Sequence, residues 1–138
     1  MTAPAPGSAR PLTVPENVTT WVATSFKYGD SHDPALAEKF GTLFTDDAEV
    51  YTPLGMSKGP EAIVAMLKKA WEHGSTSHTA KAIYTRDLDF SDVLAQGVVT
   101  MPGPDGQQMS VNFVAQINFV PDGCGGVKAS LWKFMPVS

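Results

Sequence analysis

The sequence predicts an α+β domain in which three N-terminal helices pack on a curved, mainly antiparallel sheet. Apolar residues recur at helical spacing in the first half of the chain, whereas β-branched and aromatic residues dominate after Gly74. Turn signals rich in proline and glycine separate the segments of the second half, which predicts a meander. At 138 residues we expect one domain over 12–138, preceded by a flexible tail over 1–11.

The first helix is predicted over 14–28. Thr13 and Glu16 stand three residues apart and match a capping box, in which each side chain bonds the other residue's backbone amide. Gly29 then breaks the helical pattern. The buried stripe of this helix contains Val18, Trp21, Val22 and Phe26.

The second and third helices carry their own start signals. Asp33 followed by Pro34 predicts a helix start, because a carboxylate accepts the free amide hydrogens and proline fits the first turn. A short strand is expected over 48–51 and a loop over 54–59. The third helix is predicted over 60–73, with Gly74 directly after it.

Four strands should follow the third helix. Two turns punctuate them, one over 102–106 and one over 121–126, and both contain proline, aspartate and glycine. The strands are expected over 75–88, 93–101, 108–120 and 127–135. Helices would then cover one face of the sheet and leave a pocket at its open end.

Composition excludes several classes of function. A net charge of −4 with 17% charged residues gives no basic surface for nucleic acid. The single cysteine, Cys124, cannot form an internal disulfide, and the N-terminal stretch lacks the apolar core of a signal peptide or a membrane span. We therefore expect a cytoplasmic protein with no nucleic-acid or membrane partner. Phosphate-binding loops and dinucleotide fingerprints are also missing from the sequence.

Three histidines are the candidates for acid/base chemistry near neutral pH, namely His32, His73 and His78. His73 has a structural explanation as a cation at a helix C-terminus. Strand alternation places His78 on the same face as Tyr84, and that face is apolar and small. His78 is thus either a pocket residue or a core histidine bonded to a backbone carbonyl.

Asp33 and His32 also allow two interpretations each. Asp33 is a helix cap, and an ionised carboxylate beside an imidazole also fixes the tautomer of that ring, as in a general-base pair. His32 is either a second proton donor or a solvated loop residue. No pair of histidines has the spacing of a metal site, so we expect neither a metal nor another cofactor.

The helix order, the acidic turn before Tyr51 and the stretch 57–63 resemble the nuclear transport factor 2-like superfamily, and within it the SnoaL-like polyketide cyclases and scytalone dehydratase. The resemblance covers nearly the whole chain from Val14 onward and implies a cone-shaped α+β barrel. It also implies an Asp33–His78 pair at the bottom of a conical pocket, with Tyr51 polarising a substrate oxygen.

Two departures from scytalone dehydratase concern the pocket. His32 stands where that enzyme has the tyrosine of a tyrosine-aspartate pair, and Gly97 stands at about the position of its second pocket histidine. Gln116 falls near its pocket asparagine, although Gln116 also lies on the polar side of an alternating strand. The substrate-binding residues that we expect are Gln116, Trp21, Leu54, Met56, Tyr84 and Asn112.

The resulting hypothesis is a cofactor-independent lyase, isomerase or cyclase of secondary metabolism that acts on a hydrophobic polyketide- or terpenoid-type molecule. In this hypothesis the Asp33–His78 pair removes a proton, Tyr51 stabilises the enolate oxygen, and His32 or water returns the proton. The alternatives are a non-catalytic binding or dimerisation module, and epoxide hydrolysis by an Asp-Arg-Asp site that would include Arg86 and Asp87. We also expect a homodimer, with Val98, Trp132 and Phe134 as candidates for its interface.

Overall fold

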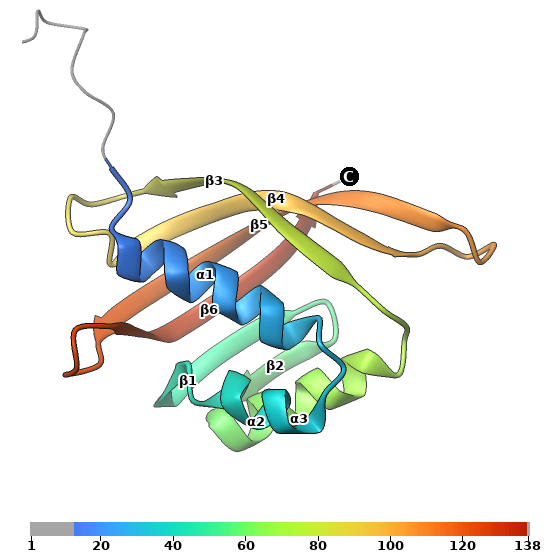
Figure 1. The fold of residues 1–138 in the computed structure, drawn as a ribbon, viewed down its shortest axis with the longest axis horizontal. Helices are drawn as coiled ribbons and strands as arrows, with labels where there is room; N and C mark the ends of the chain where they lie inside the picture. Colours follow the sequence, from blue (N-terminus) through green and yellow to red (C-terminus); the bar gives the residue numbers. More distant parts are fainter. Residues whose placement is uncertain (1–12, 138) are drawn as a thin grey trace, which may run out of the picture.

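The computed structural model describes residues 13–137 as three helices and six strands (Figure 1). The predicted tail over 1–11 lies outside the described residues. The elements in chain order are α1 (Glu16–Gly29), α2 (Pro34–Gly41), β1 (Phe44–Thr52), β2 (Gly55–Lys58), α3 (Pro60–Trp71), β3 (Ser77–Thr85), β4 (Asp92–Pro102), β5 (Gln108–Pro121) and β6 (Val127–Val137).

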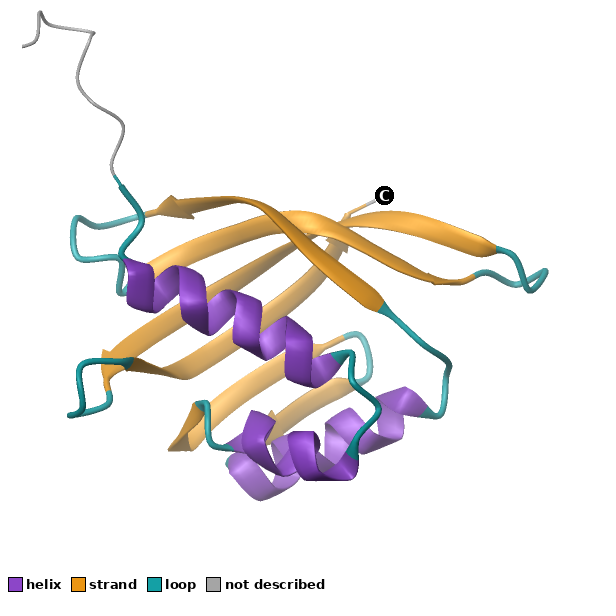
Figure 2. Ribbon diagram, viewed as in Figure 1, coloured by secondary structure: helices purple, strands orange, loops and turns teal. Residues whose placement is uncertain are grey.

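The six strands form one mixed sheet in the order β2-β1-β6-β5-β4-β3. The β1 and β6 strands are parallel, and all other neighbours are antiparallel. The sheet curves without closing, and the three helices lie on its concave side (Figure 2). The predicted α+β class, the three helices, the cone shape and the meander from β3 to β6 are confirmed.

The helix starts agree with the sequence in two cases of three. Asp33 caps α2 by accepting the Ala35 amide hydrogen at 2.9 Å, and Pro60 begins α3. The α1 helix, however, begins at Glu16 after Pro15, with no side-chain bond to its first turn. The expected capping box of Thr13 and Glu16 is therefore wrong, because Pro15 starts the helix by its fixed backbone angle.

The first hairpin was only partly predicted. The β1 strand begins at Phe44 rather than Ala48, and the segment expected to be a loop contains β2. Thr52 pairs with Gly55 across a two-residue turn, and Tyr51 pairs with Met56. Gly55 has a φ of 123°, a conformation that glycine adopts without strain.

The core lies between the helices and the inner face of the sheet. Val50, Trp132, Ile117 and Val93 stand directly opposite one another on four neighbouring strands and form a buried row across the sheet. Trp21 of α1 packs edge-on against Trp132 with ring centroids 6.1 Å apart. This packing seats α1 on the centre of the sheet.

A second row of residues crosses the outer face of the sheet. Tyr84 pairs with Leu94, Leu94 with Gln116, Gln116 with Lys133, and Lys133 with Tyr51. Side chains of directly paired residues lie on the same face of a sheet. These five side chains therefore point away from the helices.

A bulge in β3 changes the face of its second half. Ala80 pairs with Gly97 and Ala82 with Gln96, so that Lys81 is an extra residue without a partner on β4. Ile83 consequently packs against the core, whereas the Tyr84 side chain is 60% exposed. The expectation that His78 and Tyr84 share a face is wrong because this bulge shifts the alternation.

Within residues 13–137, no helix combines the length and the apolar character needed to cross a membrane.

Replacing Gly97 with alanine is expected to destabilise the fold. A Cβ atom at position 97 would collide with the Thr79 carbonyl oxygen and lie 2.8 Å from Cζ of Phe113. We expect the free energy of unfolding in urea to fall by about 2 kcal/mol, the typical cost of overpacking.

The matched control is Gly29→Ala, in which the new Cβ atom would meet Phe40 and Leu67 at ordinary distances of 3.8 and 3.9 Å. This control should be neutral or stabilising by about 0.5 kcal/mol. If the two variants were equally stable, the close contacts of Gly97 with Thr79 and Phe113 would be contradicted.

Candidate active site

The centre of the candidate site is a hydrogen-bonded pair formed by Asp30 and His78. Nδ1 of His78 lies 2.7 Å from Oδ1 of Asp30. Oδ2 of the same carboxylate accepts the backbone N–H of His78 at 2.8 Å, and Oδ1 also accepts the hydroxyl of Thr76 at 2.9 Å. Both side chains of the pair are about one-fifth exposed.

Asp30 reaches His78 because α1 ends beside the first residues of β3. Asp30 is the residue that follows α1, and its amide donates to the Phe26 carbonyl at 2.9 Å. Thr76 precedes β3, and His78 is its second residue. The carboxylate therefore links the end of the first helix to the start of an edge strand.

The pairing fixes the tautomer of His78. An ionised carboxylate only accepts hydrogen bonds, so the ring donates through Nδ1 to Asp30. The lone pair of the neutral ring is then on Nε2. Within residues 13–137 Nε2 has no protein partner, and it is the nitrogen that remains available to a ligand.

Aromatic rings hold the His78 imidazole in place. Phe26 stacks on it with ring centroids 5.0 Å apart and an angle of 13° between the planes. Phe113 and Phe134 contact it edge-on at 5.6 and 5.5 Å. A ring packed on three sides has little freedom to leave the carboxylate.

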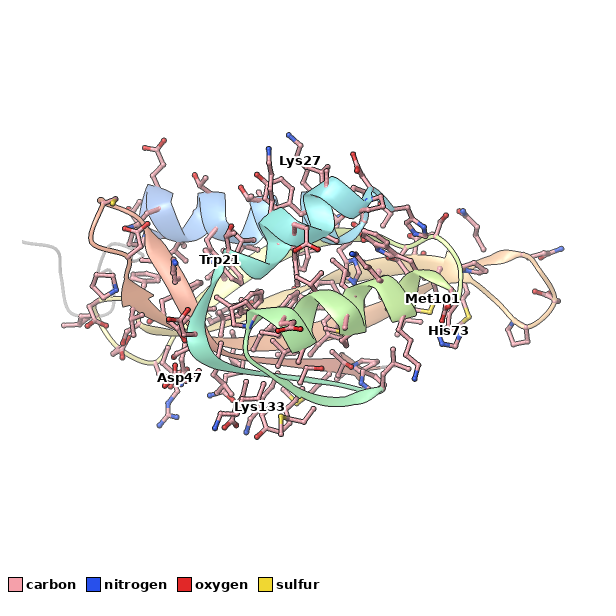
Figure 3. The ribbon with its side chains drawn as sticks, turned by 90° about the horizontal axis from the view of Figure 1, so that it is seen from below. Trp21, Lys27, Asp47, His73, Met101 and Lys133 are labelled. Carbon is pink, nitrogen blue, oxygen red and sulfur yellow. The ribbon has the colours of Figure 1, made fainter. Side chains whose placement is uncertain are left out.

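His78 lines an apolar pocket of about 280 Å³ between the helices and the inner face of the sheet. Its volume is at the lower end of the range of small-molecule sites. Figure 3 shows His73 and Met101 close together beside the end of α3, and both residues line the pocket. The apolar and aromatic lining includes Phe26, Phe40, Leu54, Met66, Leu67, Trp71, Val99, Met101, Trp132 and Phe134.

Few polar side chains of this pocket are free to meet a ligand. The hydroxyls of Ser25 and Thr76 donate to the Val22 carbonyl and to Asp30, whereas the Thr52 hydroxyl accepts the Leu54 N–H and keeps its own hydrogen. Apart from the indoles, the other hydrogen-bonding side chains that line the pocket are those of His78 and of His73, which is exposed. The pocket thus offers two imidazoles, the Thr52 hydroxyl and the indole N–H of Trp132, which has no partner within residues 13–137, on mostly apolar walls.

The predicted partner of His78 was Asp33, and the structure corrects this to Asp30. The Asp33 side chain is exposed and accepts the Ala35 amide hydrogen, so it acts as a helix cap. His78 bonds Asp30 instead. Asp30 is nearer to β3 because it follows α1 directly, whereas Asp33 stands at the start of α2.

His32 and Tyr51 lie outside the pocket. His32 is exposed and stacks on Trp71, with ring centroids 5.1 Å apart. Tyr51 lies on the outer face of β1, where its hydroxyl donates to Oε1 of Glu49 at 2.6 Å. This hydrogen bond, with smaller contributions from desolvation and the Glu49 charge, raises the pKa of Tyr51. These positions do not support the expected role of His32 in proton transfer or that of Tyr51 in enolate stabilisation.

The expected substrate-binding residues divide between the pocket and other surfaces. Leu54 lines the pocket. Trp21 is buried on the far side of the core, where its indole N–H donates to the Leu43 carbonyl at 3.0 Å. The remaining four, which are Gln116, Asn112, Met56 and Tyr84, lie on or beside the outer face of the sheet.

Two residues expected at a dimer interface face inward instead. Trp132 and Phe134 line the pocket, because β6 presents them to the helices while Lys133 and Met135 face outward. Val98 pairs with Asn112, which places it on the outer face as expected.

The alternative Asp-Arg-Asp site is not assembled in the pocket. Arg86 contacts Asp92 at 3.4 Å near the loop between β3 and β4, and its side chain is 72% exposed. Hydrogen bonds led by that of the Ser91 hydroxyl lower the pKa of Asp87 in the same loop. Residues 13–137 also contain no cluster of three or more histidine, cysteine, aspartate or glutamate side chains fit to hold a metal ion.

Sequence reasoning missed Asp30 and Thr76. Asp30 stands in the stretch 29–31, which was interpreted only as a helix breaker. The one signal it carries is its place at a helix C-terminus, where the macrodipole disfavours a negative charge. An acidic residue in such a position needs compensating donors, and β3 supplies them.

A comparison with protein families matches the profile of the SnoaL-like domain to residues 22–132. No curated protein is similar enough in sequence to count as a relative.

Solved structures share the fold at low sequence identity. ActVI-ORFA from Streptomyces Coelicolor superposes with a TM-score of 0.72 at 15% identity, covering 87% of this chain and 95% of that one. Aln2 from another Streptomyces strain gives 0.69 at 20% identity, covering 91% and 94%. The hexachlorocyclohexane dehydrochlorinase LinA-type3 from Novosphingobium barchaimii gives 0.69 at 15% identity, covering 88% of each chain.

The two aspartates near α2 are expected to differ in their contribution to stability. Asp30→Ala leaves the Thr76 hydroxyl and two His78 donors without their acceptor, so we expect the free energy of unfolding to fall by about 2 kcal/mol. Asp33→Ala removes one helix cap and should cost about 1 kcal/mol. Urea denaturation of the two variants measures both values, and a larger loss for Asp33→Ala would contradict the assignment of Asp30.

Proposed function

The chain belongs to the SnoaL-like domain family, and we propose that it is a cofactor-independent acid/base enzyme, a lyase, isomerase or cyclase that acts on a compact hydrophobic molecule. One observation carries the proposal. Asp30 holds Nδ1 of His78 and leaves Nε2 as the free ring nitrogen of a residue that lines an apolar pocket. That arrangement matches the orienting half of a general-base pair.

The first step in this proposal is removal of a proton by His78. Nε2 takes a proton from a carbon next to a carbonyl, and the electron pair of the C–H bond moves toward the carbonyl oxygen to give an enolate. The Asp30 carboxylate stabilises the imidazolium that forms. An apolar pocket strengthens this attraction because it excludes water.

The second step returns the proton. In lyase chemistry it goes to a leaving hydroxyl, which departs as water, and in isomerase chemistry it goes to another carbon. His78 itself, or a water molecule, returns it, with His73 as the second imidazole of the pocket. His73 takes the place in the scheme that the sequence had given to His32.

The proposed substrate is a polyketide- or terpenoid-type molecule. The pocket supports this class because its walls are apolar and aromatic, and because its volume suits a compact ligand that is held by shape. The name of the LinA-type dehydrochlorinase, whose fold is similar, also denotes an elimination, the loss of hydrogen chloride. The His78 geometry, rather than that likeness, carries the proposal.

The function is tested with a small panel of aromatic polyketides and terpenoids, using thermal shift for binding and mass spectrometry for conversion. We expect at least one compound to raise the melting temperature and to be converted. His78→Ala should then reduce turnover at least about 1,000-fold, within the range general-base catalysis contributes. Tyr51→Phe should retain activity, because Tyr51 lies on the outer face.

Wild-type turnover in His78→Ala would refute the scheme. A ligand that binds and is recovered unchanged throughout the panel would instead favour the alternative, a non-catalytic binding module.

We also propose that the protein forms a homodimer through the outer face of its sheet. Three apolar side chains on different strands of that face, Tyr51, Leu94 and Met135, are between 37% and 43% exposed. Gln116 and Lys133 lie between Tyr51 and Leu94, so the face combines exposed apolar and polar groups, as protein interfaces do. The exposed free thiol of Cys124 is compatible with the cytoplasm, our proposed location.

The dimer is tested by analytical ultracentrifugation. We expect the wild type to sediment at twice the monomer mass of 14.7 kDa. Leu94→Lys places a charge within the proposed interface and should shift the equilibrium to monomer. A monomeric wild type would exclude this proposal.

A further inference from the structure

The Asp30 carboxylate lies in a short connection, defined here as residues 29–33, which comprises the last residue of α1 and the residues that lead to α2. A side chain from another helix holds this connection. Trp71, the last residue of α3, donates its indole N–H to the Gly29 carbonyl at 2.7 Å. The same indole stacks on His32, with ring centroids 5.1 Å apart and an angle of 17° between the planes. Trp71 therefore contacts the connection on both sides of Asp30.

Ser31 bonds the Tyr28 carbonyl and accepts from the Asp33 amide within this connection, but two features of it are still unfavourable. Asp30 places a carboxylate at the C-terminal end of α1, where the helix dipole disfavours negative charge. His32 has a φ of 56°, a left-handed conformation that is unusual for a residue with a side chain. Such strain persists only where surrounding contacts impose it, and the stack on Trp71 is a contact of that kind.

Trp71 also lines the pocket together with His78. The Trp71 side chain thus lines the pocket and also holds the segment that contains Asp30, the partner of His78. The other indole donor of similar type, Trp21, bonds the Leu43 carbonyl at 3.0 Å and does not line this pocket.

We propose that Trp71 is a positioning residue that aligns Asp30 with Nδ1 of His78 through the Gly29 carbonyl and the His32 ring. Loss of the indole N–H frees the Gly29 carbonyl, and the connection then relaxes away from the geometry that His78 needs. The inference rests on the proposed role of the Asp30–His78 pair. In this proposal Trp71, a residue of α3, helps Asp30 to hold His78 in the tautomer that has its proton on Nδ1.

The test uses NMR of the full-length protein labelled with ¹⁵N at histidine, so it needs no substrate. The Nδ1 proton of His78, bonded to Asp30, should give a downfield signal that exchanges slowly with water and is absent in Asp30→Ala, which removes the acceptor. In Trp71→Phe we expect the exchange of this proton to be roughly tenfold faster, the factor that one lost hydrogen bond corresponds to.

The matched control is Trp21→Phe, which loses the same kind of indole-to-carbonyl bond elsewhere in the core. Both variants should lower the melting temperature to a similar extent, while only Trp71→Phe changes the exchange of the His78 proton. A second variant, His32→Ala, removes an exposed ring without opening the core, and it should change the exchange rate in the same direction by a smaller factor.

An exchange rate that stays at the wild-type value in both Trp71→Phe and His32→Ala, or that rises equally in Trp21→Phe, would overturn the positioning role. Absence of the bonded proton from the wild type would overturn the Asp30–His78 pair itself, and with it both the positioning role and the proposed function. The two failures are therefore distinguishable.

Discussion

The hydrogen bonds of the Asp30 carboxylate are the interaction on which the candidate site depends. They join the end of α1 to β3, an edge strand that pairs with β4 alone among the strands of residues 13–137. The β3 strand also contains a bulge, which interrupts its pairing at Lys81. Asp30 bonds the backbone and the ring of His78 before that bulge, so it fixes the part of β3 that forms the pocket wall.

The hydrogen bonds of Asp30 explain how the polar Asp30–His78 pair is stable beside an apolar pocket. A carboxylate at a helix C-terminus and a partly buried imidazole are each unfavourable alone. Together they satisfy each other, since the carboxylate accepts from the ring, the amide and the Thr76 hydroxyl. The other ring nitrogen, Nε2, has no protein partner within residues 13–137, while Phe26, Phe113 and Phe134 pack around the ring. Chemistry and packing thus impose the same orientation on His78.

The fold was predictable from local patterns, whereas the site was predictable only in part. Helical spacing and turn residues identify the helices and the meander, and the apolar strand positions identify the core. Asp33 was predicted to be a cap from a strong local signal, and it is indeed a cap. Its pairing with His78 came from the resemblance, which matched Asp33 to a pocket aspartate. Asp30 has no comparable signal, since its partners lie 46 and 48 residues away. His78 was found because histidine is rare and the resemblance pointed to its strand.

The faces of individual residues show where local reasoning is limited. Strand alternation alone separates Ala48 and Val50, which are buried, from Glu49 and Tyr51, and so places Tyr51 outside the pocket. For Trp132 and Phe134, alternation alone does not decide which face of the sheet they occupy. Lys133 stands between them, but β6 has apolar residues on both of its faces. Parallel pairing with β1 decides it, since Trp132 stands opposite the buried Val50. That pairing joins strands about 80 residues apart in the sequence, so no local pattern predicts it.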